Sequence, residues 1–402
     1  HFVSKFQQLS GPLMAKGIED TLFYVYNRFI AFNEVGGQPP QAGISVLAFH
    51  NFCQNRRDNW PLTMNTTSTH DTKRSEDIRA RLQVLSEIPE EWATQVKGWQ
   101  ELNQQHKIRQ NGHLIPDAND EYFLYQTLVG AYPLDEAEYA SFVERIKSYL
   151  IKAVREAKVH TAWLQPDTDY EEGFLKFVEK LLEPAEDNRF LPQLRQFQEW
   201  VSFYGALNSL TQTLLKITAP GIPDFYQGTE LWDLSLVDPD NRRPVDFEHR
   251  FALLKEIKRG LQTNPLELLA ELKQNWRDGR LKLLLITQAL ATRNQNQALF
   301  EAGNYEPLEV LGPLSEHIVA FARRYDHATV IVVASRFFTP LLKAGTFQTG
   351  ESVWGSDTYI ELPADFPTSL IDSLTGQAIQ AQDALPVSIA LEHLPVALLI
   401  SN

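Results

Sequence analysis

The chain has 402 residues, roughly two to three times a typical domain of about 150 residues, so more than one core is expected. Its 43% hydrophobic and 22% charged residues are typical of a folded globular protein and exclude a disordered, collagen-like or coiled-coil chain. The 37 basic and 51 acidic residues leave a net charge of −14, which disfavours nucleic acid and anionic lipid as partners and suits a neutral ligand.

Cysteine content and apolar runs bear on the compartment. Cys53 is the only cysteine, so no disulfide can form within the chain, which fits a reducing compartment. No apolar run approaches the roughly 18 residues that span a bilayer. The chain begins with His1 and shows no signal-peptide pattern. We therefore predict a cytoplasmic location, no membrane or nucleic-acid partner, and a chain that is part of a longer protein.

The first 85 residues mix helix-like and strand-like pieces. Ser45 predicts the N-cap of a helix that Pro61 ends. The threonine-rich residues 62–69 predict a short strand. Ser75, followed by two acidic residues, predicts the start of the next helix.

The remaining elements follow from periodicity and from turn residues. Helical patterns fill residues 86–190, 192–218 and 248–300, with a strand and loop at Asp224–Glu230. Short strands rich in β-branched residues follow in the last hundred residues: Ile318–Ala322, Thr329–Val333 and Val396–Ile400.

The main chemical signal is the polar cluster of His70, Asp71, Lys73 and Arg74, which lies in the predicted turn between a strand and a helix. In parallel α/β folds catalytic groups collect at this end of a strand. Lys16, within a second polar turn, is a further candidate. The cluster is also compatible with a capped helix that carries a solvated charge run, and the Lys16 turn with an exposed, salt-bridged helix start. Spacing alone therefore leaves both interpretations open.

Several common sites are missing from the sequence. There is no zinc or EF-hand spacing, no phosphate-binding glycine loop and no Gly-x-Ser-x-Gly elbow. We therefore predict neither a metal nor another cofactor. Tyr226, Trp232 and Trp354 are candidates for stacking on sugar rings, although aromatic residues this common usually belong to cores.

Three segments resemble motifs of the alpha-amylase family of glycoside hydrolases and transglycosidases. Ser68-Thr-His-Asp71 is similar to the motif after the seventh barrel strand, Ala219–Glu230 to the eighth strand, and Asp238–Pro244 to the loop that follows. Further segments resemble, more narrowly, the maltooligosyltrehalose synthases: Met14–Thr21, Phe32–Gly37, Thr69–Asp77 and Ala298–Tyr305.

This resemblance implies an α/β fold, the C-terminal part of a (β/α)8 TIM barrel followed by an all-β sandwich. Residues 1–85 would hold the sixth and seventh strands, and 86–190 a helical insertion. Residues 191–300 would hold the eighth strand and closing helices, and 301–402 the sandwich.

The family's reaction is an intramolecular transglycosylation that converts the reducing-end α-1,4 link of a maltooligosaccharide to an α,α-1,1 link. By resemblance, Asp71 is the carboxylate that binds the 2-OH and 3-OH at the cleavage site, and His70 bonds the same ring. Lys73 and Lys16 would hold the leaving glucose away from water. The family's nucleophile and acid/base follow strands four and five, so we expect an N-terminal part of the same enzyme to supply them.

Two other functions remain open at this stage. One is a hydrolase or intermolecular glucanotransferase of the same family, because the His-Asp and eighth-strand motifs are shared. The other is a chain that binds glucan without catalysis.

Overall fold

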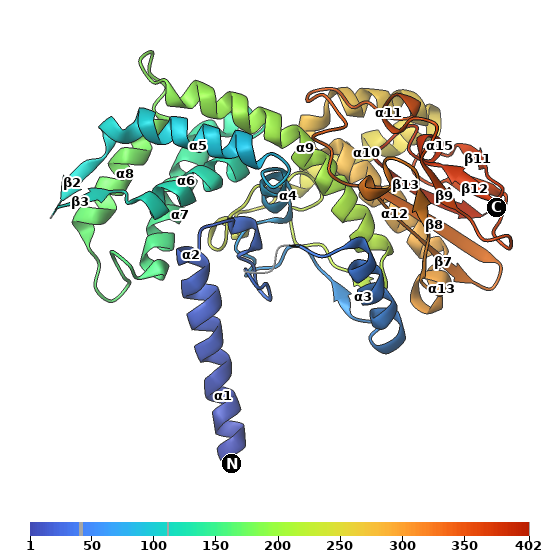
Figure 1. Cartoon of the computed structure of the whole chain (residues 1–402), viewed down its shortest axis with the longest axis horizontal. Helices are drawn as coiled ribbons and strands as arrows, with labels where there is room; N and C mark the ends of the chain where they lie inside the picture. The colour runs from blue at the N-terminus through green and yellow to red at the C-terminus, as the bar shows by residue number, and fades with distance from the viewer. Residues whose placement is uncertain (40–42, 111, 402) are drawn as a thin grey trace. The chain divides into compact units, whose positions relative to one another are not determined.

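The structure is a computed structural model that describes residues 1–39, 43–110 and 112–401. It combines helices and strands, so the prediction of a mixed fold is confirmed (Figure 1). The described residues form two compact units. The described residues of the first unit fall within 1–42, 70–202 and 234–243. The described residues of the second unit fall within 43–69, 203–233 and 244–402.

The first unit is mainly helical. Its one pair of strands among the described residues is the antiparallel pair β2–β3, on either side of residues 111–112, of which Asn111 lies outside the described residues. Its elements are α1 (Phe2–Met14), η1 (Ala15–Leu22), α2 (Phe23–Val25), η2 (Ile30–Phe32), α4 (Glu76–Val84), α5 (Pro89–Asn103), η3 (Gln104–His106), β2 (Ile108–Gln110), β3 (His113–Ile115), α6 (Ala118–Ala131), η4 (Glu136–Glu138), α7 (Tyr139–Ala157), α8 (Thr168–Leu182), the beginning of α9 (Phe190–Thr218) and η5 (Asp240–Arg242).

The N-terminal segment is helical around Lys16, which agrees with the interpretation of this turn as an exposed helix start. Residues 1–39 contain no strand; α1 continues into the π-helix η1, and Lys16 lies in the first turn of η1. A strand needs a neighbouring strand for its backbone hydrogen bonds, whereas a helix satisfies them within itself. α1 buries none of its residues and extends away from the other helices of its unit (Figure 1), so Phe2, Phe6 and Leu13 are exposed.

The second unit contains helices and most of the strands. Its helices are α3 (Val46–Asn59), the end of α9, α10 (Phe247–Thr263), α11 (Pro265–Gln274), η6 (Trp276–Asp278), α12 (Arg280–Gln295), α13 (Gln297–Ala302), η7 (Ser315–His317), α14 (Glu351–Trp354) and α15 (Val387–Ala390). The predicted cap of α3 is confirmed, because Ser45 Oγ accepts a hydrogen bond from the amide of Ala48 at 3.1 Å.

The short strand predicted within residues 62–69 is two residues long, and the strand predicted within 224–230 lies just before that range, at 222–223; together they form a short parallel pair. β1 (Met64–Asn65) pairs with β4 (Ile222–Pro223). Gly221 has φ 124°, and an added Cβ would lie 2.5 Å from the carbonyl oxygen of Thr63, so this close approach requires glycine. The side-chain amide of Asn65 donates to the backbone carbonyls of Lys216, in the last turn of α9, and of Ala219, just after it.

The strands of residues 306–401 form two antiparallel sheets. The larger has the order β11-β10-β13-β8-β7-β5, and the smaller β12-β9-β6. Their bounds are β5 (Glu306–Pro307), β6 (Val310–Leu311), β7 (Ile318–Tyr325), β8 (Ala328–Ser335), β9 (Tyr359–Glu361), β10 (Ser369–Asp372), β11 (Ala378–Gln380), β12 (Ala384–Pro386) and β13 (Val396–Ser401).

The strand β8, which is apolar from Val330 to Ala334, is buried on both faces. Val330 and Val332 pack with residues of α9 and α12, whereas Ile331 and Val333 join the core shared with the smaller sheet. This alternation follows from the two-residue period of a strand.

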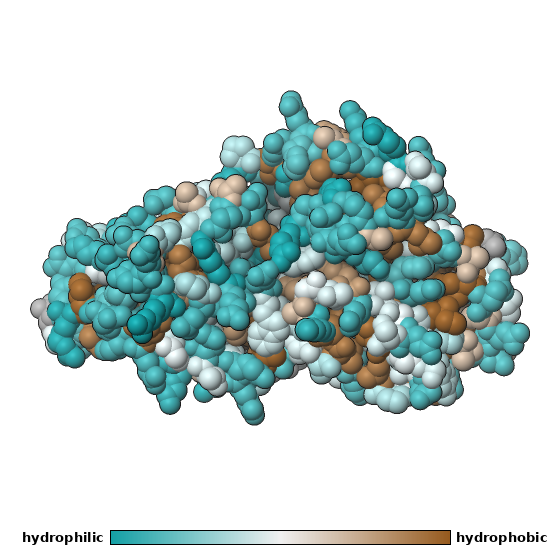
Figure 2. All heavy atoms as spheres, turned by 90° about the horizontal axis from the view of Figure 1, so that it is seen from above, coloured by the Kyte–Doolittle hydropathy of each residue, from teal (hydrophilic) through white to brown (hydrophobic). Residues whose placement is uncertain are grey.

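Hydrophilic side chains cover most of the face seen in Figure 2, with small apolar groups between them. None of the helices in the described part of the chain is both long and apolar enough to cross a membrane.

Candidate active site

The His70-Asp71 turn leads into α4, which begins at Glu76 with Ser75 at its N-cap position. This placement agrees with the sequence prediction. The hydroxyl of Ser75 does not cap the helix, so the start of α4 is marked by backbone conformation and by its acidic first turn.

A chain of alternating charges connects three of the four predicted site residues. The side chain of Lys73 is buried, with 2% of it exposed. Its Nζ atom lies 3.0 Å from Asp20 Oδ1 and 3.6 Å from Asp71 Oδ1. Lys16, which is exposed, bonds the other carboxylate oxygen of Asp20. The order is therefore Lys16, Asp20, Lys73 and Asp71, with the buried ammonium of Lys73 between two carboxylates.

The electrostatics of this chain constrain the chemistry of Asp20. Burial acts to raise the pKa of Asp20, but hydrogen bonds from Lys16 and Lys73 outweigh it and hold the pKa below its ordinary value. The hydrogen bond between Lys16 and Asp20 also raises the pKa of Lys16. Asp20 therefore stays ionised at neutral pH and is unsuited to serve as a general acid, so its role is to hold the two lysines.

Glu34 fixes the backbone of the turn. Its carboxylate accepts hydrogen bonds from the amides of Lys73 at 2.8 Å and Arg74 at 3.3 Å, and it forms an ion pair of 2.9 Å with Arg79. Charge-assisted bonds of this kind are about twice as strong as neutral ones. Asp71 lies two residues before Lys73, so it is attached to a backbone that Glu34 holds through two amide hydrogen bonds.

Arg74 serves the packing of the turn. Its buried guanidinium donates to the carbonyl of Ile30 at 3.3 Å and to Tyr149 Oη at 3.2 Å, and it lies 5.6 Å from the centre of the Phe123 ring. The cation therefore ties the turn to η2, α6 and α7.

The loop of residues 235–241 joins the same site from a distant part of the sequence. The amide of Ser75 donates to the carbonyl of Ser235 at 3.0 Å, and the amide of Val237 donates to the carbonyl of Lys73 at 3.1 Å. The side chain of Asn241 donates to the carbonyl of His70 at 3.1 Å. Two of the segments singled out in the sequence are therefore neighbours.

Ion pairs with α7 hold this loop. Arg145 binds both oxygens of Asp240, at 2.7 and 2.8 Å, and Lys152 pairs with Asp238 at 2.9 Å. Burial acts to raise the pKa of Asp238, but the hydrogen bond from Lys152 outweighs it and lowers the pKa. Both acids are thus engaged in positioning the loop.

The structure brings Asp71, Lys73 and Lys16 together through Asp20 and places His70 beside them. The side chain of Asp71 is 47% exposed, so its carboxylate is open to a ligand, and His70 is exposed as well. Sequence reasoning assigned no role to Asp20, Glu34 or Asn241. The acidic character of residues 19–20 was a weak signal, but the hydrogen bonds of Glu34 and Asn241 depend on contacts remote in sequence.

Trp354 is buried between the two sheets, which agrees with the expectation that aromatic residues this common usually belong to cores. The indole of Trp232 donates to the carbonyl of Trp276 at 2.7 Å.

A further group capable of holding a metal ion lies elsewhere in the first unit: Asp117, Asp120 and His160, with one ligand atom of each within 4.8 Å of the others. His160 already bonds Asp117 at 2.7 Å, and Tyr170 donates to Asp120. These hydrogen bonds account for the grouping without an ion.

Comparison with known proteins finds relatives that match almost the whole chain. No family model matches. The chain is 34% identical, over 99% of its length, to a candidate maltooligosyl trehalose synthase of Mycobacterium tuberculosis, of which it covers 45%. A solved maltooligosyltrehalose synthase from Arthrobacter ramosus matches 99% of the chain with a TM-score of 0.80 and 35% identity, and the chain covers 46% of it. A solved hypothetical maltooligosyl trehalose synthase of Sulfolobus tokodaii also matches 99% of the chain, with a TM-score of 0.74 and 31% identity, and the chain covers 47% of it. The chain therefore spans less than half the length of these relatives.

Proposed function

Because this chain resembles the maltooligosyltrehalose synthases over 99% of its length, as its motifs predicted, we propose that it forms the C-terminal part of such an enzyme. The reaction is the conversion of the reducing-end α-1,4 link of a maltooligosaccharide to an α,α-1,1 link, which makes the enzyme an isomerase, a (1→4)-α-D-glucan 1-α-D-glucosylmutase. The observation that carries this proposal is the charge chain that ends in the half-exposed carboxylate of Asp71.

Asp71 binds the hydroxyls of the sugar at the cleavage site. Its hydrogen bond to the 2-OH strengthens as the ring becomes oxocarbenium-like, and such bonds supply several kcal/mol to the transition state. His70, next to it and exposed, bonds the same ring.

Lys73 and Lys16 hold the leaving glucose. The reaction requires that this glucose turn and return through its anomeric hydroxyl before water attacks the glycosyl-enzyme. Because Asp20 bonds both lysines, it fixes the distance between them, and Lys73 also faces Asp71. Loss of this grip would favour hydrolysis to free glucose over isomerisation.

The nucleophile and the acid/base of a retaining mechanism would come from the remainder of the enzyme, together with the other barrel strands. The parallel pairing of β1 with β4 supports their assignment as the seventh and eighth strands of a (β/α)8 barrel. The strands of residues 306–401 would form the C-terminal β-sandwich. The exposed apolar side chains of α1 suit a surface that further polypeptide covers.

Product analysis tests this function. Two proteins are incubated with maltopentaose: the 402-residue chain, and a longer enzyme in which this chain is joined to the remaining part found in its relatives. The products are separated by chromatography. We expect maltooligosyltrehalose from the longer enzyme and no turnover by the 402-residue chain. If the longer enzyme released only glucose and shorter maltooligosaccharides, it would be a hydrolase; robust trehalose formation by the 402-residue chain would contradict the division of the catalytic groups.

A further inference from the structure

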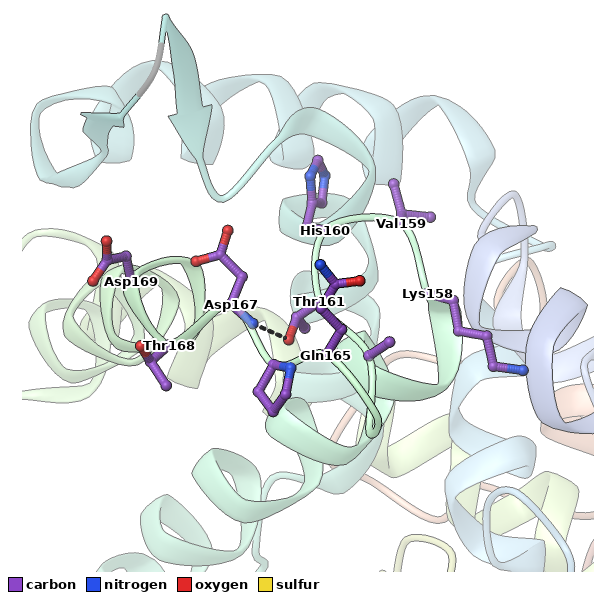
Figure 3. Close-up of a pocket in the computed structure, with 10 residues that line it drawn as sticks. Lys158, Val159, His160, Thr161, Gln165, Asp167, Thr168 and Asp169 are labelled. Carbon is purple, nitrogen blue, oxygen red and sulfur yellow. Dashed lines mark hydrogen bonds between the residues drawn. The ribbon is translucent and has the colours of Figure 1, made fainter.

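A cavity of about 510 Å³ lies in the loop that joins α7 to α8 in the first unit (Figure 3). The Asp71 site shares none of its lining residues. Most of these residues are polar, among them Lys158, His160, Thr161, Gln165, Asp167 and Asp169. Its volume lies within the range of about 300–1,000 Å³ that small-molecule sites occupy.

Hydrogen bonds make the base of this loop rigid. Thr161 Oγ1 donates to Glu171 at 2.7 Å and accepts from the amide of Asp167 at 2.9 Å, the bond drawn in Figure 3. Arg155 binds both oxygens of Glu171, at 2.8 and 2.7 Å. A loop fixed before binding loses little conformational entropy when a ligand arrives.

A tight hairpin turn at the far end of the loop exposes two apolar side chains. The backbones of Ala162 and Gln165 bond each other at 3.3 and 3.1 Å, which leaves Trp163 and Leu164 at the tip. Trp163 is 50% exposed and Leu164 is fully exposed. Burial in the protein core therefore does not account for a tryptophan at this position.

The orientation of Trp163 is set by its neighbours. Its indole N–H donates to Glu156 at 3.1 Å, and the Arg155 guanidinium lies 5.0 Å from the ring centre. Trp163 does not itself line the cavity, but Ala162 and Gln165, which flank the tip, do, and an aromatic ring held in this way offers a flat apolar surface.

Three polar groups of the cavity make no hydrogen bond to protein within the described part of the chain: the side-chain amide of Gln165, Oδ2 of Asp167 and Nδ1 of His160. In Figure 3 the amide of Gln165 extends toward the ring of His160. An amide, a carboxylate and an imidazole provide both donors and acceptors, as a ligand with several hydroxyl groups requires. Asp167 and Asp169 disfavour an anionic ligand, and the polar lining disfavours a purely apolar one.

We propose that this cavity, together with Trp163, is a second carbohydrate site that binds a glucosyl segment of an α-1,4-glucan separately from the Asp71 site. The choice of an α-1,4-glucan rests on the proposed function. A sugar ring stacks its apolar face on the indole and exchanges water for hydrogen bonds with Gln165, Asp167 and His160. The site would hold the substrate chain without taking part in bond cleavage.

Isothermal titration of the 402-residue chain with maltopentaose tests the proposal. We expect binding with a Kd on the order of 1 mM, typical of a weak site. Trp163→Ala and Gln165→Ala should each weaken it at least fivefold, and Gln165→Ala does so without disturbing the packing of Arg155. Leu164→Ala, a matched change at the same tip, should bind as the parent chain does. In Asp71→Asn, which alters the proposed cleavage site, the binding that remains should still depend on Trp163 and Gln165.

Three results would overturn the proposal. The first is no binding by the parent chain at 20 mM sugar, about twentyfold above the expected Kd. The others are an unchanged affinity in both Trp163→Ala and Gln165→Ala, or a loss of binding in Asp71→Asn alone. The outcome is independent of product identity. An enzyme that hydrolyses without forming trehalose, but whose glucan binding depends on Gln165, would refute the proposed function and retain this site.

Discussion

Replacement of Asp71 by Asn in the complete enzyme should abolish most catalysis without unfolding the protein. The change keeps the side-chain shape and removes the charge that faces Lys73 at 3.6 Å. Hydrogen bonds to the 2-OH supply several kcal/mol in the transition state, and about 1.36 kcal/mol corresponds to a tenfold change in rate. We therefore expect kcat to fall roughly 10² to 10⁴-fold, with trehalose and glucose formation reduced together because both pass through the same oxocarbenium-like state.

The structural cost of this substitution should be small. The side chain of Asp71 is 47% exposed, and a partly solvated ion pair contributes about 1 kcal/mol or less. Asp71 also lies outside the N-cap position of α4, which Ser75 occupies.

Turnover on maltopentaose and the melting temperature are measured on the same preparation. Asp58→Asn provides a matched control, because Asp58 is an exposed carboxylate paired with Arg57 at 2.7 Å on α3, and we expect it to leave kcat unchanged. A folded Asp71→Asn enzyme with near-normal turnover would refute the assignment of Asp71 to the cleavage site.

Three further predictions concern the surroundings of the site and the buried acids. Lys73→Met should raise the ratio of glucose to trehalose products more than it lowers total cleavage; an unchanged ratio would remove Lys73 from the glucose pocket. Glu34→Gln should destabilise the protein by about 1–3 kcal/mol in chemical denaturation and lower kcat more than it changes KM, because the turn before α4 loses a charge-assisted anchor; unchanged stability would contradict this anchoring role. Burial raises the pKa of Asp120 to about 6, so the folded state holds the proton of the Asp120 carboxyl more tightly than the unfolded state does. The stability that this protonation contributes is present at low pH and is lost as the pH rises through about 6. Asp120→Asn should lack this loss, and an equal difference in unfolding free energy between the two proteins at pH 4 and pH 7 would refute the cause assigned to the shift.

The sequence by itself determined the elements whose signals are local. The cap at Ser45 and the start of α4 after Ser75 agree with the structure, because capping and first-turn charges act within a few residues. The long helix α9 and the β-branched strands β7, β8 and β13 also match their patterns closely. The motif residues and the kind of relative were equally readable without a structure.

Strand lengths and the conformation near Lys16 could not be determined in this way. A strand exists only where a partner accepts its hydrogen bonds, so the pairing of β1 with β4 decided that each has two residues. The residues of η1 satisfy their backbone groups within a helix, although the sequence indicated a polar turn around Lys16.

Only the tertiary structure decided how the candidate site is assembled. The bond from Asn241 to His70 joins residues 171 positions apart, and Glu34 reaches the amide of Lys73 across 39 positions. Such contacts form when packing of helices and loops offsets the entropy of closing long loops, and no local pattern encodes that balance. The sequence therefore identified Asp71 and Lys73 as candidates, whereas the fold placed Asp20 against Lys73 and thereby connected Lys16 to them.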